Sequence, residues 1–223
     1  MLLSLNCKLF NRKATISRQE ARETIPFFLN VGFKTDSFIK LTTNSPEKLI
    51  AILKKNLAPE YYLWAFDKYY THIPNSISDS TVLKFIDAFD NAFKNDSIHV
   101  LAEYFRGDIF TYNSQIALAR KCLNNSSKIC FAINDKNRAV DAICLLGKLE
   151  SIKGNFNEAA KHTFDALSVY NTLDSKENEV RQFETILRIG GIYTKIKNYT
   201  EANTWYVKAW QFANVHECQE KNK

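Results

Sequence analysis

The chain has 223 residues and a formal net charge of +6, with 45% hydrophobic and 24% charged residues. This balance is typical of a globular protein and excludes an intrinsically disordered one. With only 6 Gly and 4 Pro, the composition argues against turn-rich sandwiches, barrels and doubly wound α/β folds. Gly-rich phosphate-binding motifs are absent. The positive charge is spread along the chain, which favours a solvated surface over a clustered nucleic-acid footprint.

Two helices are predicted between residues 45 and 94, because apolar residues recur three and four positions apart. The earlier covers residues 45–57, with Ser45 as its N-cap and Pro46 at its first helical position. The later covers residues 79–94, with Asp79 as its N-cap. Their apolar stripes, expected to face the core, are Leu49, Ile50, Leu53 and Leu57 in the first helix and Val82, Phe85, Ile86, Phe89 and Phe93 in the second.

Between these two helices, a predicted helix that begins near Pro59 is crowded with aromatic residues. Aromatic side chains at helical spacing favour packing in the core or between helices. The alternative is an exposed patch that binds a partner. The residues concerned are Tyr61, Tyr62, Trp64, Phe66, Tyr69 and Tyr70.

The C-terminal half contains an internal repeat. Residues 147–159 (GKLESIKGNFNEA) have a counterpart 43 positions later in residues 190–202 (GGIYTKIKNYTEA). Each copy has a small residue inside one helix, a tight turn with Asn and an aromatic residue, and a second helix that begins with Glu-Ala. The repeat positions are Gly147, Gly154, Phe156, Ala159 and Ala166 in the first copy and Gly190, Tyr193, Tyr199, Ala202 and Ala209 in the second.

This pattern resembles the tetratricopeptide repeat, in which small residues let two antiparallel helices approach closely. The resemblance implies an all-α fold of antiparallel helix pairs stacked as a right-handed solenoid. A weaker third copy is expected 47 residues upstream, with Gly107 and Ile109 at the turn and Ala119 opposite Ala166. The repeats would then cover residues 96–223. An N-terminal helical region, residues 1–95, would continue or cap the stack.

A narrower resemblance is to the PCI-type scaffold subunits of the proteasome lid and the signalosome. It is carried by residues 153–160 (KGNFNEAA) and 186–190 (ILRIG), and upstream by residues 56–62 (NLAPEYY). It implies a subunit of a hetero-oligomeric complex. Those subunits continue into a winged-helix module, whereas this sequence ends at Lys223, so the resemblance implies a shortened relative.

No constellation of residues for catalysis stands out. The four histidines are scattered, the five cysteines lack a C-x-x-C pair, and no G-x-S-x-G elbow is present. We therefore expect no enzyme, no cofactor and no metal, and free buried thiols in a reducing compartment. No apolar run is long enough to cross a membrane. A cytoplasmic location is expected, with the nucleus or organelle import as alternatives.

The first helices of the repeats are expected to line a groove for a protein or peptide partner. Cationic side chains there could hydrogen-bond an acidic peptide or a terminal carboxylate, although they could also be simply solvated. The candidate contact residues are Lys148, Arg188 and Lys195, with the apolar residues Leu145 and Leu187.

The favoured function is therefore a non-enzymatic protein–protein interaction scaffold or adaptor. The alternative is a regulator that senses a ligand or peptide in its repeats and binds nucleic acid through a basic N-terminal arm. The arm would consist of Lys8, Arg12, Lys13, Arg18 and Arg22.

Overall fold

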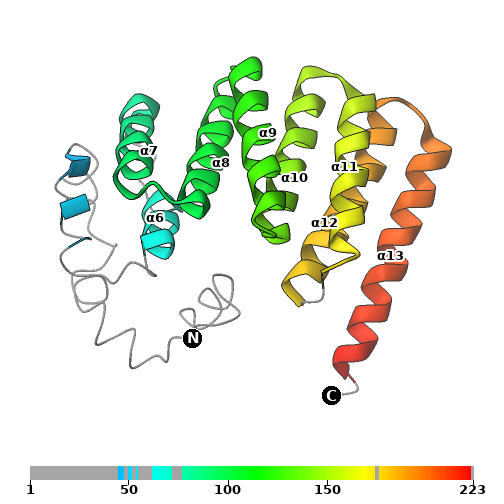
Figure 1. The fold of residues 1–223 in the computed structure, drawn as a ribbon. Coiled ribbons are helices and arrows are strands. Elements are labelled where there is room, and N and C mark those ends of the chain that lie inside the picture. The colour runs from blue at the N-terminus through cyan, green and yellow to red at the C-terminus, as the bar shows by residue number, and fades with distance from the viewer. Residues whose placement is uncertain are drawn as a thin grey trace. The chain divides into compact units, whose positions relative to one another are not determined.

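The computed structural model describes residues 45–47, 50, 51, 54, 62–71, 77–173 and 176–221 (Figure 1). Within these ranges all regular structure is α-helical, as the sequence predicts, and no described helix is long and apolar enough to cross a membrane. Packing divides the chain into two compact units, Met1–Phe105 and Arg106–Lys223. The helices are α6 (Tyr62–Thr71), α7 (Asp79–Phe93), α8 (Asp96–Tyr112), α9 (Ile116–Ala132), α10 (Lys136–Lys153), α11 (Phe156–Tyr170), α12 (Lys176–Lys195) and α13 (Tyr199–Lys221).

The core of the first unit is aromatic. Phe66 of α6 is fully buried and stacks on Phe89 of α7, with ring centroids 4.3 Å apart. The same ring meets Phe105 of α8 edge-on at 5.3 Å, and Tyr70 stacks on Phe105 at 3.7 Å. At these positions the aromatic residues of α6 form core, which is the favoured interpretation of their spacing. Tyr61 and the side chains of Trp64 and Tyr69 lie outside the described part of the chain.

The α7 stripe is buried at Val82, Phe85, Ile86 and Phe89, and half-buried at Phe93, as its periodicity predicts. The predicted N-cap, in contrast, is wrong by one residue. Ser78 is the N-cap, with extended backbone, and Asp79 lies in the first turn. A carboxylate there still interacts favourably with the helix dipole without capping an N–H group.

The helix predicted over residues 45–57 is only partly described. Pro46, Glu47, Ile50, Ala51 and Lys54 are helical, and Ile50 is buried. The stripe residues Leu49, Leu53 and Leu57 lie outside the described residues.

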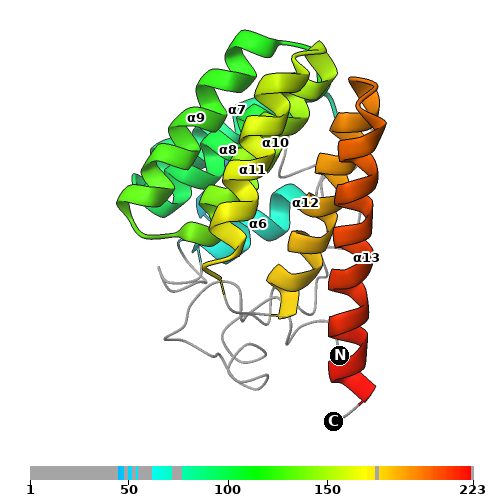
Figure 2. The ribbon, with the colours of Figure 1, turned by 90° about the vertical axis from the view of Figure 1, so that its right-hand side faces the viewer.

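In the second unit, consecutive helices run in opposite directions and pack against each other (Figures 1 and 2). Contacts also join alternate helices. Phe164 of α11 lies against Trp205 of α13, with ring centroids 5.2 Å apart. On the other side, Arg188 of α12 donates a hydrogen bond to the Cys144 carbonyl oxygen of α10 at 3.4 Å. Helices α10 and α12 therefore lie side by side, as do α11 and α13.

Four turns of this unit share one backbone conformation. In each, a residue with positive φ is followed by a residue whose N–H donates to the carbonyl oxygen five positions earlier, as in a Schellman cap. The positive-φ residues are Ser114, Asn134, Gly154 and Lys197, and the donors that follow them are Gln115, Asp135, Asn155 and Asn198. Only one of the four caps is glycine, which is consistent with the low glycine content.

Small residues recur at fixed distances from these turns. Alanine follows the donor residue by four positions in every case, and each alanine is at most 3% exposed: Ala119, Ala139, Ala159 and Ala202. Glycine lies inside the preceding helix in three cases. A Cβ atom added at Gly107, Gly147 or Gly190 would lie 2.6–3.0 Å from Leu123, Thr163 or Tyr206 of the following helix, respectively. These glycines and alanines are therefore close-approach positions between consecutive helices.

The third repeat copy is offset differently from the expectation. Gly107 lies inside α8 rather than at a turn, and it corresponds to Gly147, 40 residues later. Ala119 corresponds to Ala159 rather than to Ala166. The turn itself contains Ser114, whose φ is 58°. A serine in the left-handed region has no recognisable turn signature, so the predicted alignment placed the turn at the nearest glycine.

Candidate partner-binding face

The predicted contact residues lie on two helices that touch each other. Leu145 and Lys148 belong to α10, and Leu187, Arg188 and Lys195 belong to α12. The Arg188 hydrogen bond to Cys144 and an ion pair between Arg181 and Asp141 hold these helices together. The structure thus brings the five residues to adjacent helices.

Leu145 is a correction to the predicted set. It is only 7% exposed and packs in the interior, because an apolar side chain between packed helices is removed from water. The other four residues reach solvent, with Leu187, Arg188 and Lys195 exposed and Lys148 half-buried. The candidate face is therefore defined by Lys148, Leu187, Arg188 and Lys195.

Two further residues of this face were missed by sequence reasoning. Tyr112, at the end of α8, is 70% exposed, and the Lys148 ammonium group lies 3.1 Å from its hydroxyl and 4.4 Å from its ring centroid. This geometry combines a hydrogen bond with a cation–π contact. Ile152, one helical turn beyond Lys148, is also exposed.

A sequence signal for these residues exists once the repeat offsets are known. Tyr112, Ile152 and Lys195 stand 40 and 43 residues apart, so they occupy the same position in three successive repeats. Each lies three residues before the Schellman donor of its own turn. The partner-binding face is thus a row of one exposed residue per repeat, flanked by Lys148 and Arg188.

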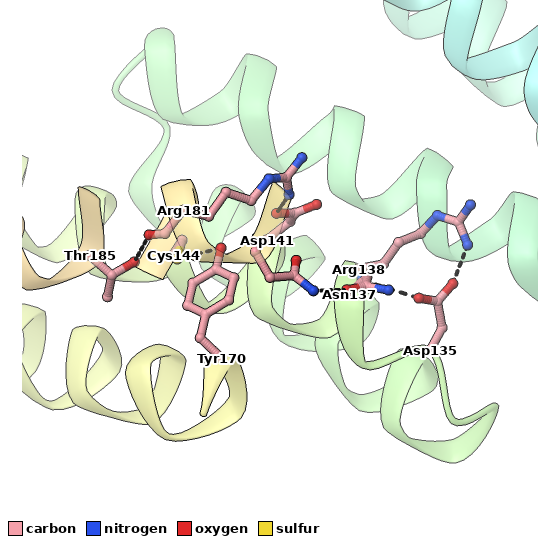
Figure 3. A network of polar contacts seen from close by, with 9 residues as sticks. Asp135, Asn137, Arg138, Asp141, Cys144, Tyr170, Arg181 and Thr185 are labelled. Carbon is pink, nitrogen blue, oxygen red and sulfur yellow. Dashed lines mark hydrogen bonds and ion pairs between the residues drawn. The ribbon is translucent and has the colours of Figure 1, made fainter. Parts of the chain in front are cut away.

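A network of polar contacts fixes the relative position of α10 and α12 beside this face (Figure 3). Arg181 pairs with Asp141, and the Thr185 hydroxyl donates to the Arg181 carbonyl oxygen at 2.8 Å. Near the start of α10, the Asn178 amide donates to the Asn137 side chain at 3.3 Å. Asp135 caps α10 by accepting from the Arg138 N–H at 3.2 Å, and their side chains form an ion pair. The network leaves the face itself to other residues.

The thiols next to this network are not poised for nucleophilic chemistry. Burial raises the pKa of Cys130 to about 12 and also raises that of Cys144, whose sulfur lies 4.0 Å from the buried Tyr170 hydroxyl. A thiolate is the reactive form of cysteine, so both thiols are inert while the protein is folded. Among the described residues, no group of three His, Cys, Asp or Glu side chains could hold a metal ion.

We therefore predict that Cys130 and Cys144 resist alkylation in the native protein. At pH 8, iodoacetamide should modify both residues at least about a hundredfold more slowly in buffer than in urea, because less thiolate is present. Peptide mass spectrometry of timed samples measures the two rates. Rapid labelling of Cys130 in the native state would contradict the buried placement.

The comparisons with known proteins concern the fold. The chain matches no protein-family model and no curated protein. Among solved structures it is similar to the crystal structure of BtubC (BKLC) from P. vanneervenii, with a TM-score of 0.52 and 9% sequence identity. The match covers 89% of this chain and 90% of that chain. At this identity the likeness shows a shared helical fold and carries no function.

The residues of the alternative function cannot be placed. Lys8, Arg12, Lys13, Arg18 and Arg22, the proposed basic arm, lie outside the described residues.

Proposed function

We propose that the chain is a non-enzymatic interaction scaffold whose second unit belongs to a right-handed, tetratricopeptide-like solenoid. Three observations support the solenoid. Alternate helices contact each other on both sides, the turns repeat one conformation, and alanine and glycine recur where helices approach closely. Such stacks use one layer of helices as a binding surface.

The observation that carries the proposal is the set of exposed cations on adjacent helices of one layer. Lys148, Arg188 and Lys195 lie on α10 and α12, and Lys148 is held in place by Tyr112. Glu184 is the exposed acid closest to Arg188 along α12, so the face keeps a positive balance. An acidic peptide with apolar residues, for Leu187 and Ile152 to contact, matches this chemistry.

The direct test is a double charge reversal, Arg188→Glu with Lys195→Glu. Binding of a fluorescent acidic peptide, measured by anisotropy, should weaken about tenfold or more. The loss should be greatest at low salt, where screening is weakest. Thermal unfolding should stay nearly unchanged, because exposed charges contribute little to stability.

The matched control is Lys121→Glu with Lys128→Glu on α9. These lysines are also exposed and also seven residues apart, but α9 lies outside the α10–α12 layer. The control should bind the peptide like the natural protein at high salt. Equal losses in both double variants would show that only net charge matters and would contradict the proposed face.

We further propose that the scaffold acts in a hetero-oligomeric complex of the lid or signalosome type, in the cytoplasm or nucleus. The support is the resemblance carried by residues 153–160 and 186–190. Affinity purification from the source cell with mass spectrometry should recover subunits of such a complex. Recovery of an unrelated stable assembly would contradict this assignment and leave the charge-reversal test untouched.

A further inference from the structure

The last described helix has an open side. Tyr199, Asn203, Tyr206 and Trp210 recur four, three and four residues apart, so they form one stripe along α13. Tyr199 is 65% exposed, Trp210 66% and Tyr206 41%. Val207, beside the stripe, is also exposed. Buried Ala202 and Ala209 lie on the inner side of the helix.

The internal repeat shows that this side is a packing surface. Val207 and Trp210 occupy the positions that Phe164 and Leu167 hold in α11, 43 residues earlier. Both α11 residues are half-buried, and Phe164 packs against Trp205 of α13. The α13 stripe therefore presents, uncovered, the surface that α11 covers with the helices that follow it. Terminal helices of stacks usually have polar outer faces instead.

The stripe is also free of charge. The charged residues in the first half of α13 are Glu201 and Lys208, and both lie elsewhere on the helix. The Lys208 ammonium group lies 3.9 Å from the ring centroid of Trp205, which is on the α11 side. In a chain with a net charge of +6, two copies repel each other at most surfaces. An uncharged aromatic stripe is where they can meet.

We infer that the α13 stripe pairs with the same stripe of a second copy, in an antiparallel arrangement. The 4-3-4 spacing reads the same in both directions, as a two-fold axis requires. A centre between Thr204 and Trp205 places Tyr199 opposite Trp210 of the second copy. The same centre places Asn203 opposite Tyr206. A polar residue at such a seam specifies register, as a single asparagine does in coiled coils.

The exposed area makes this a weak interface. Aromatic side chains bury about 150–250 Å² each, so the exposed parts of the three aromatic residues supply roughly 350 Å² per copy. A stable interface needs about 1,000 Å² from both copies together. The stripe and Val207 approach that total, so a dimer should form in the micromolar range and dissociate on dilution. The inference concerns α13 and does not depend on the partner-binding face.

Sedimentation velocity of the full chain tests the inference. The weight-average mass should rise from 25.7 kDa toward twice that value as the concentration increases to several hundred micromolar. Trp210→Lys and Tyr199→Glu should each weaken self-association about tenfold or more, as expected of central aromatic residues. Because these side chains are exposed, circular dichroism should show an unchanged thermal unfolding. Thr204→Lys, at an exposed position outside the stripe, is the matched control and should still dimerise.

The double variant Tyr199→Glu with Trp210→Lys tests the register. In the antiparallel pair each new glutamate faces a new lysine, so association should return at low salt and exceed that of either single variant. A parallel pair would place like charges together. A natural chain that stays monomeric at all concentrations would overturn the inference, as would a double variant no better than the single ones. Binding of a different protein's helix to the monomeric stripe would also overturn it.

Discussion

Ala119→Leu should lower the melting temperature by about 5 °C. Ala119 lies in α9, is 0% exposed and occupies the close-approach position that follows each Schellman turn. Three added carbon atoms overpack such a contact and cost about 1–3 kcal/mol. In a chain of this size, 1 kcal/mol corresponds to a shift of about 2–4 °C in Tm. Differential scanning calorimetry measures the shift.

Ala117→Leu is the matched control, because it makes the same substitution in the same helix at an exposed position. It should change Tm by less than about 1 °C, as surface substitutions usually do. Lys197, the exposed residue closest to Ala202, would be a poorer control. Its φ of 62° lies in the left-handed region, where a leucine is strained. Similar losses at positions 117 and 119 would show that the packing assignment is wrong.

The helices of this protein could be predicted from its sequence because their signal is local. The stripe from Val82 to Phe89 becomes buried where the 3.6-residue period places it. The match between residues 147–159 and 190–202 likewise marks two close helix approaches, at Gly147 and Gly190. Each of these predictions needs only the order of residues within one or two helices.

The third repeat and the exposed face could not be predicted, for two different reasons. The third repeat was misaligned because its turn uses Ser114 where the first copy uses Gly154, so the turn had no distinctive residue. The Tyr112–Lys148 contact joins residues 36 positions apart. Such a contact depends on how two helices slide along each other, which packing decides. Leu145 was assigned to the groove because the helix periodicity alone does not show which apolar residues a neighbouring helix covers.

Arg120→Met should destabilise the protein by about 2 kcal/mol, through the loss of an ion pair with a buried carboxylate. The Glu150 side chain is 3% exposed, and it accepts from the Arg120 Nε at 2.9 Å and from the Asn155 amide at 2.8 Å. Breaking a buried pair typically costs about 3–5 kcal/mol, because one charge is left unpaired. Arg120 is 40% exposed, so water can partly replace it, and the expected cost falls between this range and that of a surface pair.

The effect should depend on pH in a defined direction. Burial alone would raise the pKa of Glu150, but the hydrogen bonds from Asn155 and Arg120 and the Arg120 charge outweigh it and hold the pKa below its usual 4.5. A lowered folded pKa stabilises the protein above the unfolded pKa, and this stability is lost as the pH falls through the folded value. The difference between the natural protein and Arg120→Met should therefore be largest at neutral pH and shrink below about pH 4.5. Urea denaturation at pH 7 and pH 3.5 measures it.

Two further variants separate the ion pair from a general loss of charge. Lys161→Met removes a lysine whose ammonium group lies 4.0 Å from Glu158, in a pair exposed on both sides, and it should change stability by less than about 0.5 kcal/mol. Arg120→Met with Glu150→Leu removes both buried partners, so it should be more stable than Arg120→Met alone, because no carboxylate is left unpaired in the interior. If the double variant is the less stable of the two, Glu150 stabilises α10 through Asn155 rather than through Arg120. The conserved geometry of the Schellman turn at Glu150–Asn155 would then be the main contribution of this carboxylate.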